Sequence, residues 1–157
     1  MKNAPRIMAQ VILFSLIALG FMVNRATGVE APSEDQDLEG KPCAQYDRGV
    51  MLVNSQDPSP HFVRAFNLFS KASYANEARA QYALGSLYLR GWGGPRDAAL
   101  AYAWIALSAE PGDERIESAL NGLRQQMSKP MLDLAEEKRR EISAKLPALR
   151  IHCPPGL

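Results

Sequence analysis

The sequence has little of what most catalytic sites are built from. Its 157 residues include only two histidines, His61 and His152, and only two cysteines, Cys43 and Cys153. Neither histidine lies in a local nucleophile motif, so no Ser/His/Asp or Cys/His pattern typical of a hydrolase is present. A phosphate-binding glycine loop is also missing, because the glycines at 91–94 fall between two predicted helices. We therefore predict no enzyme activity, no catalytic residues, no cofactor and no small-molecule substrate.

The charge is almost balanced, with 18 basic and 17 acidic residues and a formal net charge of +1. Proteins that follow a phosphate backbone need a concentrated excess of Lys and Arg. Here the basic residues are scattered among acidic ones. The composition therefore argues against nucleic acid as a partner.

The N-terminus has the three parts of an export signal. Lys2 and Arg6 precede an apolar stretch from Ile7 to Val23, and the small residues of Ala26-Thr27-Gly28 follow. We predict a signal peptide over residues 1–28, cleaved after Gly28, and a periplasmic or secreted protein. The alternative is an uncleaved membrane anchor, because the apolar run approaches the roughly 18 to 20 residues that span a bilayer. Membrane contact is expected only through this segment.

The next segment, residues 29–42, is acidic, contains two prolines and has few apolar residues. Such a composition cannot bury enough apolar surface to offset the entropy of ordering. We predict a flexible acidic linker.

A tandem repeat follows. Ala44-Gln45-Tyr46 recurs as Ala80-Gln81-Tyr82 at an offset of 36 residues, and the same offset carries Gly49 onto Gly85. A fixed period in this range is typical of a helical solenoid, in which each unit buries its apolar face against its neighbours.

Helical periodicity and breaker residues divide the repeat region into segments. Pro58 and Pro60, the glycines before Pro95, and Pro111-Gly112 interrupt it, and Asp97 is placed to begin a helix. The pattern predicts an all-α protein of six helices in three antiparallel hairpins. The helices are expected at about 43–56, 61–74, 77–89, 97–109, 114–127 and 130–146.

Gly49 and Gly85 fall inside predicted helices, where Gly costs about 1 kcal/mol relative to Ala. We expect close approach of the partner helix to offset this cost. Ala65 and Ala101 are the small residues expected opposite these glycines, and Leu68 and Trp104 are expected to fill the space beside them. The aromatic side chains expected in the core are Phe66, Phe69, Tyr102 and Trp104.

The middle unit carries Leu84-Gly85 and Tyr88 in one helix, a glycine-rich turn ending in Asp97, and Trp104 in the next helix. This pattern resembles the Sel-one-like repeat of the tetratricopeptide superfamily. Residues 77–112 form the well-formed copy and residues 43–76 a degenerate one. Residues 113–146 resemble a capping hairpin, and residues 147–157 form a C-terminal tail.

The resemblance implies a right-handed superhelix of about three helix hairpins, with a concave surface lined mainly by the first helix of each pair. Exported bacterial members of the family are similar in role to adaptors that hold other envelope proteins together. The partner is thus expected to be another protein or a peptide. The groove positions carried over by the resemblance are Arg79, Tyr82, Ser86, Leu89 and Arg90, with Tyr46, Asp47, Asn54, Arg115, Ser118 and Gln125 as further positions.

Export makes a disulfide between Cys43 and Cys153 the first expectation. The alternatives are two free thiols, or a metal site that also uses His61 and His152. In a stack of hairpins the first helix begins at the end of the stack where the sixth helix finishes. That distance is roughly 20 Å for two repeat steps. The eight residues from Lys145 to Cys153 span about 26 Å when extended, so the tail can reach back.

Two other functions stay open. One is an envelope hydrolase or cell-wall-binding enzyme that uses His61 or His152. The other is a structural subunit packed permanently into a larger envelope assembly.

Overall fold

A computed structural model describes residues 35–154, and the predicted signal peptide lies outside the described residues. Residues 1–37 and 38–157 form separate units, and the description below concerns the second. Between residues 35 and 154, no helix is both long and apolar enough to cross a membrane.

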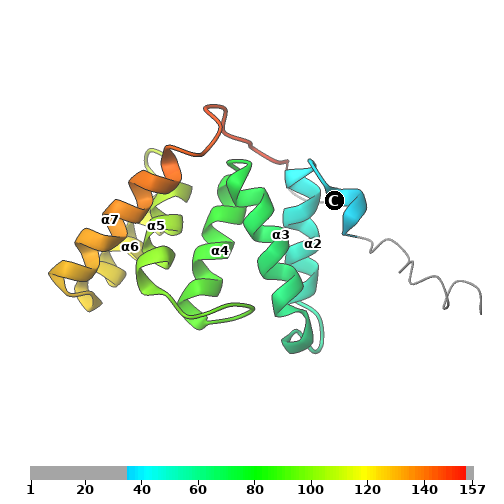
Figure 1. The fold of residues 1–157 in the computed structure, drawn as a ribbon, viewed down its shortest axis with the longest axis horizontal. Helices are drawn as coiled ribbons and strands as arrows, with labels where there is room; N and C mark the ends of the chain where they lie inside the picture. The colour runs from blue at the N-terminus through cyan, green and yellow to red at the C-terminus, as the bar shows by residue number, and fades with distance from the viewer. Residues whose placement is uncertain (1–34, 155–157) are drawn as a thin grey trace, which may run out of the picture. The chain divides into compact units, whose positions relative to one another are not determined.

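The described part of the chain is helical, which confirms the predicted all-α solenoid. Six α-helices follow one another across the molecule (Figure 1). They are α2 (Pro42–Val53), α3 (Phe62–Tyr74), α4 (Ala78–Arg90), α5 (Ala98–Ser108), α6 (Glu114–Gln126) and α7 (Lys129–Ser143). Single turns of 3-10 helix, η1 (Gln36–Leu38) and η2 (Ser59–His61), precede α2 and α3.

The helices pack in chain order, α2 on α3, α3 on α4 and α4 on α5, and both α6 and α7 cover α5. One core cluster lies among α2 to α5 and is centred on Leu68, Phe69, Leu84 and Trp104. A second cluster joins α5 to the last two helices. Of the four aromatic residues expected in the core, three are 2% exposed or less and Phe66 is half-buried against the first cluster. The core of the described residues is therefore built from two clusters, and α5 contributes buried side chains to both.

The two helical glycines mark close helix contacts, as predicted, and the side chains nearest to them are those of Phe69 and Ile105. A Cβ on Gly49 would lie 2.5 Å from the Phe69 ring, and one on Gly85 would lie 2.7 Å from Ile105 Cγ1 and 2.9 Å from Ala101 O. Phe69 and Ile105 are themselves 36 residues apart, so the contact repeats in register. Phe69 and Ile105 each follow Leu68 and Trp104 by one residue. One residue along a helix is a rotation of about 100°, so the two side chains of each pair point in different directions.

The glycine-rich turn and the acidic helix starts behave as their chemistry predicts. Gly91 ends α4 in the left-handed conformation, with φ 69°. Gly93 has φ 77°, and a Cβ there would lie 2.2 Å from Phe62 O. The Asp97 side chain accepts a hydrogen bond from Leu100 N at 2.8 Å and caps α5. This turn therefore both stops α4 and packs on the start of α3.

The prediction of a flexible linker as far as Pro42 is wrong at its end. Leu38 packs against the first core cluster, and its carbonyl accepts hydrogen bonds from Lys41 N at 3.0 Å and Gln45 Nε2 at 2.9 Å. Glu39 pairs with Lys71 of α3 at 2.6 Å. Apolar packing of Leu38, hydrogen bonds to its carbonyl and an ion pair of Glu39 together attach this segment to α2 and α3.

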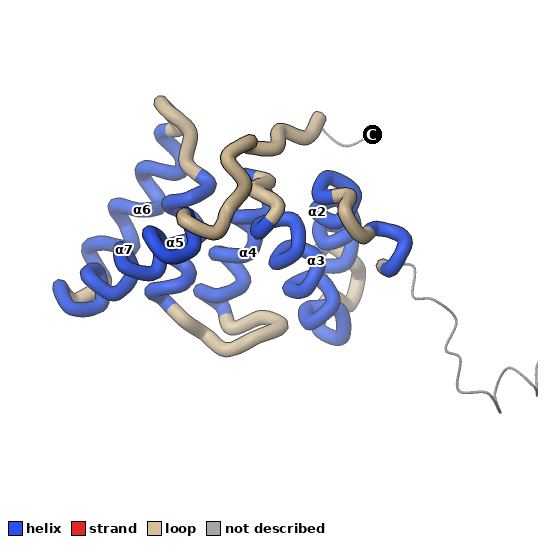
Figure 2. The backbone as a smooth tube through the Cα atoms, turned by 45° about the horizontal axis from the view of Figure 1, so that its top comes forward, coloured by secondary structure: helices blue, strands red, loops and turns tan. Residues whose placement is uncertain are grey.

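The C-terminal tail returns across the stack from α7 to α2, as the backbone in Figure 2 shows. Asn76 Nδ2 donates to Pro147 O at 2.9 Å, and Ile151 N donates to Asn76 O at 2.9 Å. Arg150 donates to Ala109 O at 3.1 Å and also to the carbonyl of Leu107. These bonds fasten the tail to the loops between helix pairs.

The tail ends in the predicted disulfide. Cys43 and Cys153 are bonded, with 5.5 Å between their Cα atoms. Neither cysteine is therefore a free thiol. Among the residues that the structure describes, no three His, Cys, Asp or Glu side chains are grouped to hold a metal ion.

A polar network fixes α6 and α7 to α5. Tyr102 is 2% exposed, its hydroxyl donates to Glu136 Oε1 at 3.1 Å, and it accepts from Arg124 Nε at 3.0 Å. Arg139 Nε donates to Glu136 Oε2 at 2.7 Å. Burial raises the pKa of Tyr102. Burial alone would raise the pKa of Glu136 too, but the bonds from Arg139 and Tyr102 outweigh it and lower that pKa.

Candidate functional site

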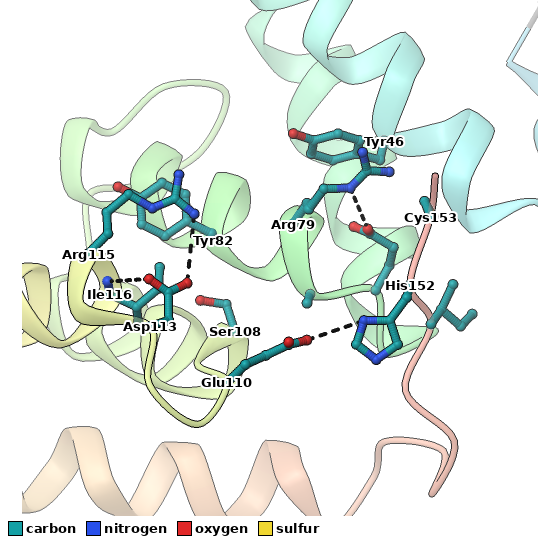
Figure 3. Close-up of a pocket in the computed structure, with 13 residues that line it drawn as sticks. Tyr46, Arg79, Tyr82, Ser108, Glu110, Asp113, Arg115, Ile116, His152 and Cys153 are labelled. Atoms are coloured by element: carbon teal, nitrogen blue, oxygen red, sulfur yellow. Dashed lines mark hydrogen bonds and ion pairs between the residues drawn. The ribbon is translucent and has the colours of Figure 1, made fainter. Parts of the chain in front are cut away.

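A pocket of about 350 Å³ lies where the first turns of α4 and α6 meet α2 and the C-terminal tail. These are the first helices of the three pairs, the face expected to be concave. The pocket is lined by Tyr46, Glu77, Ala78, Arg79, Tyr82, Ser108, Glu110, Asp113, Arg115, Ile116, Ile151, His152 and Cys153 (Figure 3). Polar and aromatic side chains dominate this lining.

One side of the pocket is a unit of three residues, Tyr46, Glu77 and Arg79. The Arg79 guanidinium carbon lies 4.3 Å from the centroid of the Tyr46 ring, within the range of a cation–π contact. Arg79 Nε donates to Glu77 Oε1 at 3.0 Å. The other oxygen of Glu77 accepts from Ala80 N at 2.5 Å, so this buried carboxylate caps α4 and orients Arg79 together. Burial raises the pKa of Tyr46, and the positive charge of Arg79 opposes that rise.

The opposite side repeats the unit 36 residues later with Tyr82, Asp113 and Arg115. Arg115 lies 5.7 Å from the Tyr82 ring centroid, and its Nη2 is 3.8 Å from Asp113 Oδ2. Asp113 accepts from Ile116 N at 3.1 Å and caps α6. In each unit the acidic cap of one repeat therefore directs its arginine over the tyrosine of the preceding repeat.

The tail closes the pocket with Ile151, His152 and Cys153. His152 Nδ1 lies 3.3 Å from Glu110 Oε1, which reaches from the loop between α5 and α6 (Figure 3). The Nε atom of Arg150 is 3.9 Å from the same oxygen. The disulfide and these polar contacts hold this side of the pocket against the helix ends.

Positive and negative charges are mixed in the pocket, since Arg79 and Arg115 each stand beside an acidic residue and Glu110 adds a third carboxylate. A mixed lining of this kind does not concentrate a highly charged ligand. The pocket instead presents the N–H donors of two arginines that are stacked on tyrosine rings near the N-termini of α4 and α6. Such an arrangement suits hydrogen bonds to a polypeptide.

The structure brings four of the predicted groove residues into this pocket: Tyr46, Arg79, Tyr82 and Arg115. The other predicted positions lie elsewhere. Arg90 is the last residue of α4, and its guanidinium carbon lies 4.6 Å from the centroid of the Trp92 ring. Asn54 is the C-cap of α2. Ser86 is half-buried and donates to Tyr82 O at 2.9 Å. Leu89 packs against the second core cluster, Asp47 is half-buried on α2, and Ser118 and Gln125 are exposed on α6.

Sequence reasoning missed the acidic caps Glu77 and Asp113 and the contribution of the tail. The caps carry a signal, because they are also 36 residues apart and each lies two residues before a pocket arginine. In the tail, only Cys153 carries a signal, through its expected bond to Cys43. The path of the tail depends on contacts of Arg150 and Ile151 with loops that are distant in sequence.

The fold and this site define a helical-repeat protein built from stacked antiparallel helix pairs. The chain carries two Sel1 repeats, at residues 44–77 and 78–113, which confirms the resemblance seen in the sequence. A search of curated proteins gave no match.

A solved structure supports the same architecture. The chain is similar to c5321, a protective antigen present in uropathogenic Escherichia coli strains that displays an SLR fold. The TM-score is 0.61 at 21% sequence identity over 77% of this chain. The match covers 28% of c5321, so the likeness concerns the fold of the repeats.

Proposed function

We propose that this protein is an exported, non-enzymatic adaptor that binds another protein or a peptide on its concave face, at the pocket between α2, α4 and α6. Sel1 repeats and the SLR fold support a role in protein–protein interaction. The observation that carries the proposal is the repetition of the Tyr–Arg–acid unit on both sides of one pocket. Core packing does not account for the second unit, because the Arg115 side chain is 77% exposed.

Export is part of the proposal. The N-terminal pattern of Lys2, an apolar stretch and Ala26-Thr27-Gly28 favours a cleaved signal. A disulfide persists in oxidising compartments such as the periplasm, so the Cys43–Cys153 bond supports the same location. Mass spectrometry of the protein from the envelope fraction should find a mature N-terminus at Val29. A protein that keeps Met1 would favour the anchored form.

Site-specific photocrosslinking tests the binding face. A photoreactive residue at Tyr82 in the pocket should give a discrete crosslinked species in the envelope fraction. The matched control is the same group at Val63 on α3, which is 59% exposed and outside the pocket. Equal crosslinking from both positions would contradict a specific pocket. If the free protein aggregated unless coexpressed with a larger assembly, the structural-subunit alternative would gain instead.

The hydrolase alternative would have to use His152, because His61 lies on η2 outside the pocket. The pocket hydroxyl of Ser108 donates to Ile105 O at 2.7 Å within its own helix, so it is engaged in a local bond. Turnover of a cell-wall fragment that disappears in His152→Ala would favour the enzyme and count against the adaptor.

A further inference from the structure

We propose that the two Tyr–Arg units are equivalent sites for a main-chain carbonyl of an extended polypeptide. The chain's own tail occupies the first unit, and the second takes an extended, uncharged segment of the partner. This inference rests on the proposed binding function and names the chemistry that the pocket recognises.

The tail shows what the first unit binds. Arg79, while stacked on Tyr46 and paired with Glu77, donates from Nη1 to Pro154 O at 3.4 Å. The tail contributes this carbonyl without any side-chain charge. A guanidinium has five N–H donors, so one that is stacked and ion-paired still has donors left for a carbonyl.

The same preference occurs elsewhere along the tail. Asn76 Nδ2, before α4, donates to the tail carbonyl of Pro147 at 2.9 Å. In the opposite direction, Arg150 of the tail donates to the carbonyls of Leu107 in α5 and of Ala109 just after it. Two side chains of the helical body, Arg79 and Asn76, therefore hold the tail through its main-chain carbonyl groups. The use of side-chain donors on carbonyls is a repeated feature of the surface and not a single contact.

The second unit has the same parts but a more open arginine. Tyr82, Asp113 and Arg115 each follow their counterparts by 36 residues. The side chain of Arg115 is 77% exposed, against 32% for Arg79. Its separation of 3.8 Å from Asp113 is also longer than the 3.0 Å between Arg79 and Glu77. Arg115 can therefore turn toward an incoming chain without giving up a short bond.

The charges favour a neutral acceptor. Each arginine already has a carboxylate beside it, and Glu110 adds another negative charge to the same pocket. A free carboxylate would be repelled by these acidic side chains, whereas a peptide carbonyl carries no net charge and would not be.

The repeat register also limits the number of sites. Position 118, one repeat after Tyr82, is Ser, so the third repeat has no aromatic ring for an arginine to stack on.

The test uses a phage-displayed library of random heptapeptides, selected against the full chain with its disulfide formed. Selected peptides are then made synthetically, and their Kd is measured by fluorescence anisotropy. Arg115→Lys should weaken binding about tenfold, because an ammonium group lacks the planar fork that stacks and donates together. Arg140→Lys, on the exposed side of α7, is the matched control and should change Kd less than about twofold.

The salt dependence of Kd distinguishes the two groups that Arg115 could bind, a neutral carbonyl and a charged carboxylate. A carbonyl site predicts peptides without enrichment in Asp or Glu, and a Kd that changes little between low and high salt. Acidic peptides whose binding falls steeply with salt would overturn the carbonyl assignment. Peptides that bind with the same Kd to wild type and Arg115→Lys, but lose affinity in Glu110→Gln at the opposite side of the pocket, would support binding at the pocket and refute this site. Selection that yields no binding peptide would count against both proposals.

Discussion

Cys43 at the start of α2 and Cys153 in the tail, 110 residues apart in sequence, are joined by a disulfide that ties the last segment of the chain to the first helix. The bond spans the two complete repeats and the third hairpin. It also fixes one side of the pocket, because Cys153 and its two preceding residues line it. Stability and pocket shape are therefore linked through one covalent contact.

Removing the disulfide should lower the free energy of unfolding by about 4 kcal/mol, since the bond closes a long loop in the unfolded chain. Urea denaturation of Cys43→Ser/Cys153→Ser measures this change. Wild type treated with reductant should behave like the double variant, and reductant should not affect the double variant itself. Identical urea midpoints for wild type and the double variant would show that the bond adds nothing.

Gly85→Ala should destabilise the protein by about 1 to 3 kcal/mol although Ala is the better helix former. The new methyl group would lie 2.9 Å from the carbonyl oxygen of Ala101, which belongs to the backbone of α5 and cannot rotate away. The matched control is Gly122→Ala on α6, where nothing lies within 4 Å of the added Cβ. That variant should be more stable than wild type by about 0.5 to 1 kcal/mol. Thermal melts of both variants decide the matter, and equal effects would refute the close contact.

Glu136 should make stability depend on acid pH. Its pKa is lowered from 4.5 in the folded state, so its contribution is present above that value and is lost as pH falls through the folded pKa. Glu136→Gln should therefore be less stable than wild type at pH 7, and the gap should close as the pH falls through the lowered pKa of Glu136. Glu137→Gln, exposed on the same helix, is the control and should follow the wild-type curve. A gap that persists at low pH would locate the effect in packing instead of charge.

Arg150→Ala should lower the free energy of unfolding by about 2 to 3 kcal/mol, because the hydrogen bonds from its charged guanidinium to the carbonyls of Leu107 and Ala109 are lost. Arg150 is also bonded to Gln81 Oε1 at 3.2 Å. Arg96→Ala is the control, since Arg96 is exposed and makes a single bond to Leu89 O at 3.0 Å; it should cost less than about 0.5 kcal/mol. Urea denaturation compares them. Equal costs would mean that the Arg150 hydrogen bonds do not stabilise the attachment of the tail.

Much of the fold could be predicted from local signals. Pro58, Pro60 and the glycine-rich turn before Asp97 separate helices because they act on the backbone itself. The repeat of Gly49 at Gly85 gave the packing register. Periodicity could not decide whether Leu68 or Phe69 faces Gly49, because neighbouring apolar positions both lie near the buried face.

The pocket was predictable only in part. Tyr46, Arg79, Tyr82 and Arg115 lie on the first helices of the pairs, and the repeat predicts that these helices share a face. That Arg79 stacks on the tyrosine of the preceding repeat depends on the step between repeats, which the sequence does not specify. The tail's contribution depends on long-range contacts such as that of Ile151 with Glu77.

The central claim is that a partner binds between the first turns of α4 and α6. Hydrogen exchange on the complex with the partner identified by crosslinking from Tyr82 tests it most directly. Binding at the pocket predicts slower exchange of backbone amides at residues 78–82 and 113–116, with no change on α3. Protection confined to α3 or to the outer side of α7, with residues 78–82 and 113–116 unchanged, would contradict the account.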